Sequence, residues 1–236
     1  VVEDKFKNGR YGLKHTFYDI DLNKKYLIYP KVKLFNIDIL ASPKATFSFL
    51  CPDSNHPHAI DLGMPSGKKW ACCNVDADAP EEYGGYYAWG DVETKSTYTL
   101  GTYTRKYVEN ISGTQFDVAT KKWGDNWQIP TKEDMEWLTK NCSWVDKTWH
   151  GVKGTLIIAP NGNSIFLPYS DLVASDRSYG MGGCCYWTGT QDLLYAKEED
   201  KPYSLFMPIA TEVKTVWSVY YLAHYGMLIR PIWSTK

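Results

Sequence analysis

Residues 1–50 carry the pattern of hydrophobic and polar positions that is typical of β-strands. The run 26–35 is rich in β-branched and aromatic residues, and the run 45–49 alternates between apolar and polar positions. Three or four strands do not complete a sandwich of about seven. We therefore expect 1–50 to be either a small β appendage or a partial Ig-like or fibronectin-like β module, the closing part of a longer domain. Residues 51–58 have two prolines and no periodicity, which predicts a linker and a domain boundary.

Residues 59–236 form the second predicted domain, in which short apolar runs alternate with turn residues. The runs 154–159 and 164–168 flank Asn161-Gly162, a dipeptide typical of tight hairpin turns. The pattern therefore predicts an antiparallel hairpin in the middle of this domain.

Helices are expected to be few. Thr131 is a good N-cap, Asp134 can complete a capping box, and apolar residues follow at helical spacing up to Asn141. A second short helix is predicted over 78–82, where a proline and acidic residues suit a first turn. Late strands are expected over 203–207 and 227–232. The fold class is therefore α+β, with short helices, mixed strands and long loops.

Aromatic residues make up 15% of the chain, with 10 Trp, 18 Tyr and 8 Phe. Such side chains suit both irregular cores and binding surfaces. The formal net charge of -1 offers no basic excess for neutralising phosphates, so nucleic acid is not an expected partner. No apolar run is long enough to span a bilayer, and no signal peptide is visible. We expect either a cytosolic chain or a trimmed piece of an exported one.

The six cysteines include two adjacent pairs, Cys72-Cys73 and Cys184-Cys185. Neither pair has the spacing of a zinc motif, and most of these thiols are expected to be free or buried. A Cys73–Cys142 disulfide is the alternative if the protein is exported. No nucleotide-binding loop, zinc-hydrolase motif or nucleophile elbow occurs, so neither a cofactor nor a catalytic residue is expected.

Motifs spread across the second domain resemble those of one family. They are Ala59–Ala71 (with Asp-Leu-Gly-Met-Pro-Ser-Gly), Glu81–Gly90, Trp127–Thr131, Pro160–Pro168, Tyr186–Thr190 and Gly226–Ile232. In this order they are similar to the motifs of the Fibrobacter-type major paralogous domain, which is common in gut Bacteroidetes. Gln128 stands where that family usually has Arg.

This resemblance implies a C-type-lectin-like fold, related to the formylglycine-generating enzymes and often preceded by an Ig-like module. Trp70, Trp89, Trp127 and Trp187 fall inside the motifs and are expected to fill the core. Some proteins of this fold are variable proteins of diversity-generating retroelements in gut bacteria and phages. The segments 218–225 and 192–195 consist of residue types that such diversification produces.

The late aromatic residues point to a binding surface, because Tyr-rich loops provide rigid contact area at little entropic cost. A packed β-hairpin is the alternative. The candidate ligand-binding residues are Asp176, Arg177, Tyr179, Asp192, Tyr195, Tyr203, Trp217, Tyr220, Tyr221, His224 and Tyr225.

The resulting hypothesis is an extracellular or cell-surface protein that binds a protein or glycan ligand and catalyses nothing, with a possible lipid anchor upstream of Val1. No metal is expected. Asp76, Asp78, Glu81 and Glu82 are acidic neighbours, and they could bind calcium only if their oxygen atoms were placed closely together. Two alternatives stay open. One is a structural or adhesin component, and the other is a paired-cysteine oxidase that uses Cys184-Cys185.

Overall fold

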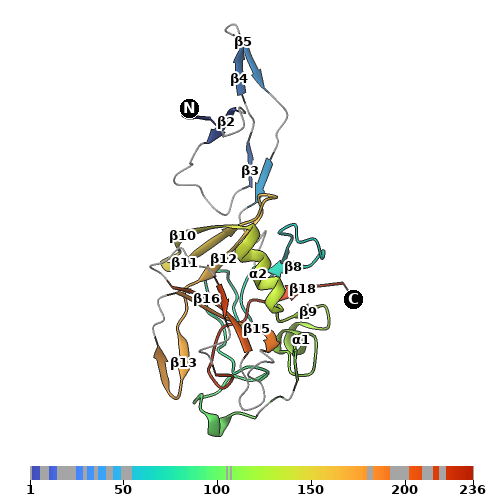
Figure 1. The fold of residues 1–236 in the computed structure, drawn as a ribbon, viewed down its shortest axis with the longest axis vertical. Coiled ribbons are helices and arrows are strands. Elements are labelled where there is room, and N and C mark those ends of the chain that lie inside the picture. The colour runs from blue at the N-terminus through green and yellow to red at the C-terminus, as the bar shows by residue number, and fades with distance from the viewer. Residues whose placement is uncertain are drawn as a thin grey trace.

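The structure is a computed structural model of the 236-residue chain. It describes residues 55–104, 106, 108–179, 183–191 and 222–235. In addition, it describes the backbone of the strands within 1–50 and of the strands at 202–208 and 215–217. The architecture is α+β, mostly strands with few helices, which confirms the predicted fold class at this level (Figure 1).

Within 1–50 the backbone forms short strands in antiparallel pairs. They are β1 (Val2–Lys5), β2 (Tyr11–Lys14), β3 (Lys25–Ile28), β4 (Lys31–Leu34), β5 (Ile37–Leu40) and β6 (Ala45–Ser48). β1 pairs with β2, and the β4–β5 hairpin is nested between β3 and β6, which pair with each other. The predicted run over 26–35 thus divides into β3 and β4. Pro30 stands between them in the sequence and lacks the N–H that a continuous ladder needs.

Within residues 59–236, a four-stranded sheet joins parts of the chain that are distant in the sequence. Its strands lie in the order β7 (Ala59–Ile60), β8 (Lys69–Ala71), β18 (Ile232–Trp233) and β9 (Trp127–Gln128). Ile232 is opposite Trp70 on one side and opposite Gln128 on the other. The sheet therefore brings three of the motifs together: those that contain Trp70, Gln128 and Ile232.

The predicted helix is α2 (Lys132–Asn141), and its start confirms the capping box. Thr131 Oγ1 accepts a hydrogen bond from Asp134 N at 3.3 Å, and Asp134 Oδ2 accepts one from Thr131 N at 3.0 Å. The other helices are α1 (Val118–Trp123) and the short 3-10 helix η1 (Leu100–Thr102).

The prediction of a helix over 78–82 is wrong, because the backbone there forms bends and a turn. The acidic side chain of Glu82 accepts a hydrogen bond from Asp78 N at 2.7 Å, and the carbonyl of Pro80 accepts one from Arg230. Local and long-range hydrogen bonds therefore satisfy this turn without a helix.

The predicted central hairpin is confirmed. β11 (Val152–Ile158) and β12 (Ser164–Pro168) pair antiparallel across Asn161-Gly162, and β10 (Ser143–Trp149) adds a third strand. A separate small hairpin consists of β13 (Leu172–Ala174) and β14 (Arg177–Tyr179). A further three-stranded sheet has the order β15 (Gly183–Gln191), β16 (Pro202–Pro208) and β17 (Thr215–Trp217).

The strand predicted over 227–232 is only partly confirmed, since β18 begins at Ile232. In the residues before β18, successive backbone carbonyls accept hydrogen bonds from different segments of the chain. Met227 O accepts from Tyr87 N at 2.9 Å, and Leu228 O accepts from Trp187 N at 3.0 Å. The hydrogen bonds of this segment therefore go to β15 and to loops rather than to one neighbouring strand.

β15 divides the core of the second segment into two clusters. Cys184 and Tyr186 pack in one cluster with Trp70, while Cys185 and Trp187 pack in the other. This alternation is what a strand with two buried faces requires.

Arg230 is fully buried and joins several loops around the core. Its guanidinium donates to Asn74 Oδ1 at 2.8 Å and to Phe166 O at 2.9 Å, and also to the carbonyls of Ala71, Cys72 and Pro80. Neutral oxygens therefore satisfy its donors and compensate the desolvation of the charge.

Candidate binding surface

Three segments that are distant in the sequence meet at the β13–β14 hairpin. Val173 exchanges two backbone hydrogen bonds with Gly226, of 2.9 and 2.8 Å. Ser175 exchanges two with Tyr98, both of 2.8 Å. Figure 1 shows the hairpin, labelled β13, extending from the body of the domain. We call the loop 95–104, the hairpin 172–179 and the turn 222–226 together the three-segment surface.

The hairpin carries three of the predicted ligand-binding residues, and all three are exposed. Asp176 and Arg177 lie at its tip, with 3.9 Å between a carboxylate oxygen and the guanidinium Nε. Tyr179 is 48% exposed, which is unusual for a large aromatic side chain. A positive charge, a negative charge and an aromatic ring are thus available to a ligand at one place.

The turn 222–226 carries two more of the predicted residues, His224 and Tyr225, and both are half-buried. Tyr225 N donates to Leu222 O at 2.9 Å, and the rings of His224 and Tyr225 stack edge to face with centroids 4.8 Å apart. Ala223 is buried, and its carbonyl accepts from Trp89 N at 2.8 Å. Tyr225 also packs against the core, so both the binding and the packing interpretations have support at this residue.

The loop 95–104 contributes to this surface, although sequence reasoning did not predict it. Leu100, in η1, is 73% exposed. The only signal in the sequence is a local run of Ser, Thr and Tyr, which is too common to indicate a site.

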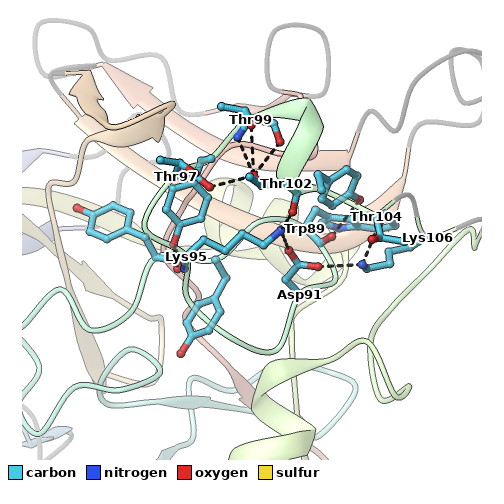
Figure 2. A network of polar contacts seen from close by, with 12 residues as sticks. Trp89, Asp91, Lys95, Thr97, Thr99, Thr102, Thr104 and Lys106 are labelled. Carbon is cyan, nitrogen blue, oxygen red and sulfur yellow. Dashed lines mark hydrogen bonds and ion pairs between the residues drawn. The ribbon is translucent and has the colours of Figure 1, made fainter.

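A polar network holds this loop against the core (Figure 2). Asp91 forms ion pairs with Lys106 at 2.8 Å and with Lys95 at 2.5 Å. Lys95 and Lys106 also donate to the carbonyls of Thr102 and Thr104, respectively. One carboxylate therefore neutralises two lysines that lie on either side of the loop.

Tyr98 ties the loop to the other two segments. Its hydroxyl donates to Tyr86 O at 2.5 Å and accepts from Lys95 N at 3.1 Å. Burial raises the pKa of Tyr98 above its usual value. A Cβ on Gly226 would lie 2.9 Å from a ring carbon of Tyr98, so glycine allows this close approach.

The remaining predicted residues divide into two groups. The backbones of Tyr203 and Trp217 lie in the adjacent strands β16 and β17, where Ser204 is opposite Trp217. Asp192, Tyr195, Tyr220 and Tyr221 lie outside the described residues.

The tryptophans of the motifs are core residues, as predicted. Trp70, Trp89 and Trp187 are fully buried, and the indole N–H groups of Trp89 and Trp187 donate to the carbonyls of Thr188 and Tyr87. Trp127 is less buried than predicted: it is half-buried and stacks edge to face on Trp123.

The side chains of the adjacent cysteines of β15 point away from each other. They lie in different core clusters on opposite faces of the strand. Burial raises the pKa of Cys185 to about 12 and raises that of Cys184 well above its usual value. Two buried, weakly acidic thiols that face apart offer neither the contact nor the thiolate that the oxidase alternative needs.

The alternative Cys73–Cys142 disulfide is wrong. Cys73 lies beside Cys72, whereas Cys142 follows α2 and packs against another cluster, and both are free thiols.

Three of the four acidic neighbours considered for calcium have carboxylates with other partners. Asp76 pairs with Lys122 at 2.7 Å, and Glu81 contacts His150 at 2.5 Å in an exposed turn. Glu82 caps the backbone N–H of Asp78. These carboxylates therefore do not converge as calcium ligands do. Within the part of the chain that the structure describes, the potential metal ligands that do converge are those of His56, Cys72 and Cys73.

Comparison with known protein families, with curated proteins and with solved structures finds no match. None of the helices in the described part of the chain has the length and apolar character that crossing a bilayer requires.

Proposed function

We propose that this chain is an extracellular ligand-binding protein and that the three-segment surface is its binding face. The observation that carries the proposal is the position of the β13–β14 hairpin, which bridges to Gly226 through Val173 and to Tyr98 through Ser175. Loops held on a rigid scaffold are where proteins most often place binding residues. The predicted residues on the hairpin and on the turn thereby become neighbours.

The chemistry of this face suits a protein or glycan ligand on a cell surface. Tyr and Arg are the residue types that contribute most to binding energy at interfaces, and Tyr179 and Arg177 are both exposed here. Tyr179 can stack on a sugar ring or pack against an apolar side chain. Asp176 and His224 can supply the polar contacts around it.

The family resemblance gives this proposal its wider form, a C-type-lectin-like domain of a gut Bacteroidetes protein or of a phage particle. The arrangement of the motifs supports it. The opening motif at Trp70, the middle motif at Gln128 and the closing motif at Ile232 share one sheet. Motifs that meet in the scaffold and leave the loops exposed are what a fold with exchangeable binding loops requires.

Diversification by a retroelement is the sharper version of the proposal. In the described part of the segment 218–225, His224 and Tyr225 are partly accessible, whereas Ala223 is buried. The version predicts a nearby near-copy of the 3′ coding segment that differs mainly at adenines, together with a reverse transcriptase gene. Flanking DNA with neither would refute the diversification and leave ligand binding to be tested separately.

Ligand binding is tested with a printed glycan array and with biotinylated surface proteins of intact bacterial and epithelial cells. The double variant Arg177→Ala/Tyr179→Ala should lose about 10-fold or more in affinity for whatever the wild type captures. The matched control is Tyr83→Ala/Lys121→Ala, since Tyr83 is 42% exposed and lies outside the three-segment surface. Equal loss in both variants, or capture that neither affects, would refute the proposed face.

A further inference from the structure

Two parts of the chain that sequence analysis treated separately meet at a thiol-rich site. His56 and His58 belong to the predicted linker, and Cys72-Cys73 follows β8. Cys72 N donates to His58 O at 3.0 Å, which continues the pairing of β7 with β8 by one step. The backbone therefore positions the two histidines directly beside the two cysteines.

The side chains converge more closely than the backbone requires. His56 Nδ1 lies 3.3 Å from Cys72 Sγ, and His58 Nδ1 lies 3.7 Å from the same sulfur. The ligand atoms of His56, Cys72 and Cys73 all lie within 4.8 Å of one another. In a tetrahedral zinc site, Zn–S and Zn–N bonds of about 2.3 and 2.0 Å place neighbouring ligand atoms about 3.5 Å apart.

We propose that His56, Cys72 and Cys73 bind a zinc ion, with His58 as the nearest candidate for the fourth ligand. Imidazole and thiolate are the donors that zinc prefers, and a set of this kind suits neither calcium nor magnesium.

Burial and charge fit this assignment. Cys72 and Cys73 are buried, while both histidines are half-buried, so the site opens to solvent on the histidine side only. Two thiolates would cancel the charge of Zn²⁺ and leave no net charge in the apolar surroundings of Ala77 and Trp123. The hydrogen bond from Arg230 to the Cys72 carbonyl also places a cation beside the backbone that carries the two thiols. Binding would displace the thiol protons and form the metal–sulfur bonds with no change of oxidation state.

The bound metal would crosslink two parts of the backbone. It would fasten the segment 55–58, which follows the N-terminal strands in the sequence, to the bend after β8. Metal binding to the folded state alone would raise the midpoint of thermal unfolding.

The test uses the full chain, purified with reductant, stripped with a chelator and titrated with Zn²⁺ against a chromophoric competitor. We expect one ion per chain. Co²⁺ should give the thiolate-to-metal charge-transfer absorption of a tetrahedral site. Both Cys72→Ser and Cys73→Ser should weaken zinc binding by about 100-fold or more, and His56→Gln by about 10-fold or more.

The matched controls are Cys142→Ser and His150→Gln, which alter a half-buried thiol and an exposed imidazole elsewhere. Both should bind Zn²⁺ as the wild type does. His56→Gln keeps the test valid if a buried cysteine variant fails to fold, because His56 is half-buried. The proposal is overturned if the wild type binds no Zn²⁺, if the Co²⁺ complex shows no thiolate band, or if folded His56→Gln retains wild-type affinity.

Discussion

Val173 and Gly226 exchange a pair of backbone hydrogen bonds, of 2.9 and 2.8 Å, between segments more than 50 residues apart. This ladder fastens the β13–β14 hairpin to the turn that precedes the closing motif. Ser175, the residue that follows β13, pairs in turn with Tyr98, so one short hairpin contacts two other loops. The proposed binding face depends on this relationship, since each loop alone presents few residues.

Replacing Gly226 with alanine should disturb this junction. The new Cβ would meet ring carbons of Tyr98 at 2.9 to 3.1 Å, which forces the ring or the backbone to move. We expect Gly226→Ala to lower the free energy of unfolding by about 1–3 kcal/mol, as overpacking does. Chemical denaturation measures it.

The same clash provides a control. Tyr98→Leu removes the ring, whereas Tyr98→Phe removes only the hydroxyl. A double-mutant cycle should show that Leu, and not Phe, relieves the cost of Gly226→Ala. Additive effects in the Leu cycle would show that the ring is not what the methyl group meets.

The Asp91 network should make a measurable contribution to stability. Asp91 and Lys106 are largely buried, with side chains 13% and 9% exposed, so solvent screens their interaction only weakly. We expect Asp91→Asn to cost about 1–3 kcal/mol of unfolding free energy, because it leaves the buried Lys106 and the half-buried Lys95 without a counter-charge. Denaturation in low and high salt measures this cost.

A cycle with Lys106→Met isolates the pair. The double variant should be destabilised less than the sum of the single variants, because removing the cation removes its need for the carboxylate. A coupling that vanishes in high salt would contradict the burial of the pair.

Asp117 is the N-cap of α1 and joins it to the middle motif. Its carboxylate accepts from Ala119 N and Thr120 N in the helix, and from Gly113 N and Ile129 N at 2.8 Å. Asp117→Ala would leave these donors unsatisfied and should lower the unfolding free energy by about 3 kcal/mol. Asp117→Asn, which keeps one acceptor oxygen, should lose less. Equal losses, measured by chemical denaturation, would show that the number of acceptors does not matter.

The thiol of Cys142 predicts a pH dependence. Burial raises the pKa of Cys142 from 9.0 to about 11. The folded state therefore favours the neutral thiol, and its contribution to stability is complete below pH 9 and falls as the pH rises toward 11. The difference in stability between wild type and Cys142→Ser should shift against the wild type across this window. A difference that does not change with pH would contradict the burial of the thiol.

Local signals in the sequence predicted the local structures well. Thr131 and Asp134 supply both halves of a capping box, and Asn161-Gly162 between two apolar runs defines a hairpin. The helix prediction over 78–82 failed, although a proline and acidic residues can start a helix. Here Glu82 accepts a hydrogen bond from the backbone of Asp78, and Pro80 accepts one from Arg230. Sequence patterns do not show such long-range partners.

The candidate site was predicted only in part for the same reason. Composition indicated that Tyr179, His224 and Tyr225 were candidates, but only the pairing of Val173 with Gly226 shows that their segments meet. The metal ligands were missed because His-x-His and Cys-Cys match no familiar zinc spacing. The hydrogen bond from Cys72 N to the backbone of the linker brings them together.

The most direct test of the central claim is hydrogen exchange of the backbone amides with and without a captured ligand. If the three-segment surface is one binding face, ligand should slow amide exchange together in the peptides that cover 95–104, 172–179 and 222–226. The peptide that covers β10 should not change. Protection confined to one of the three segments, or found only outside them, would contradict the account.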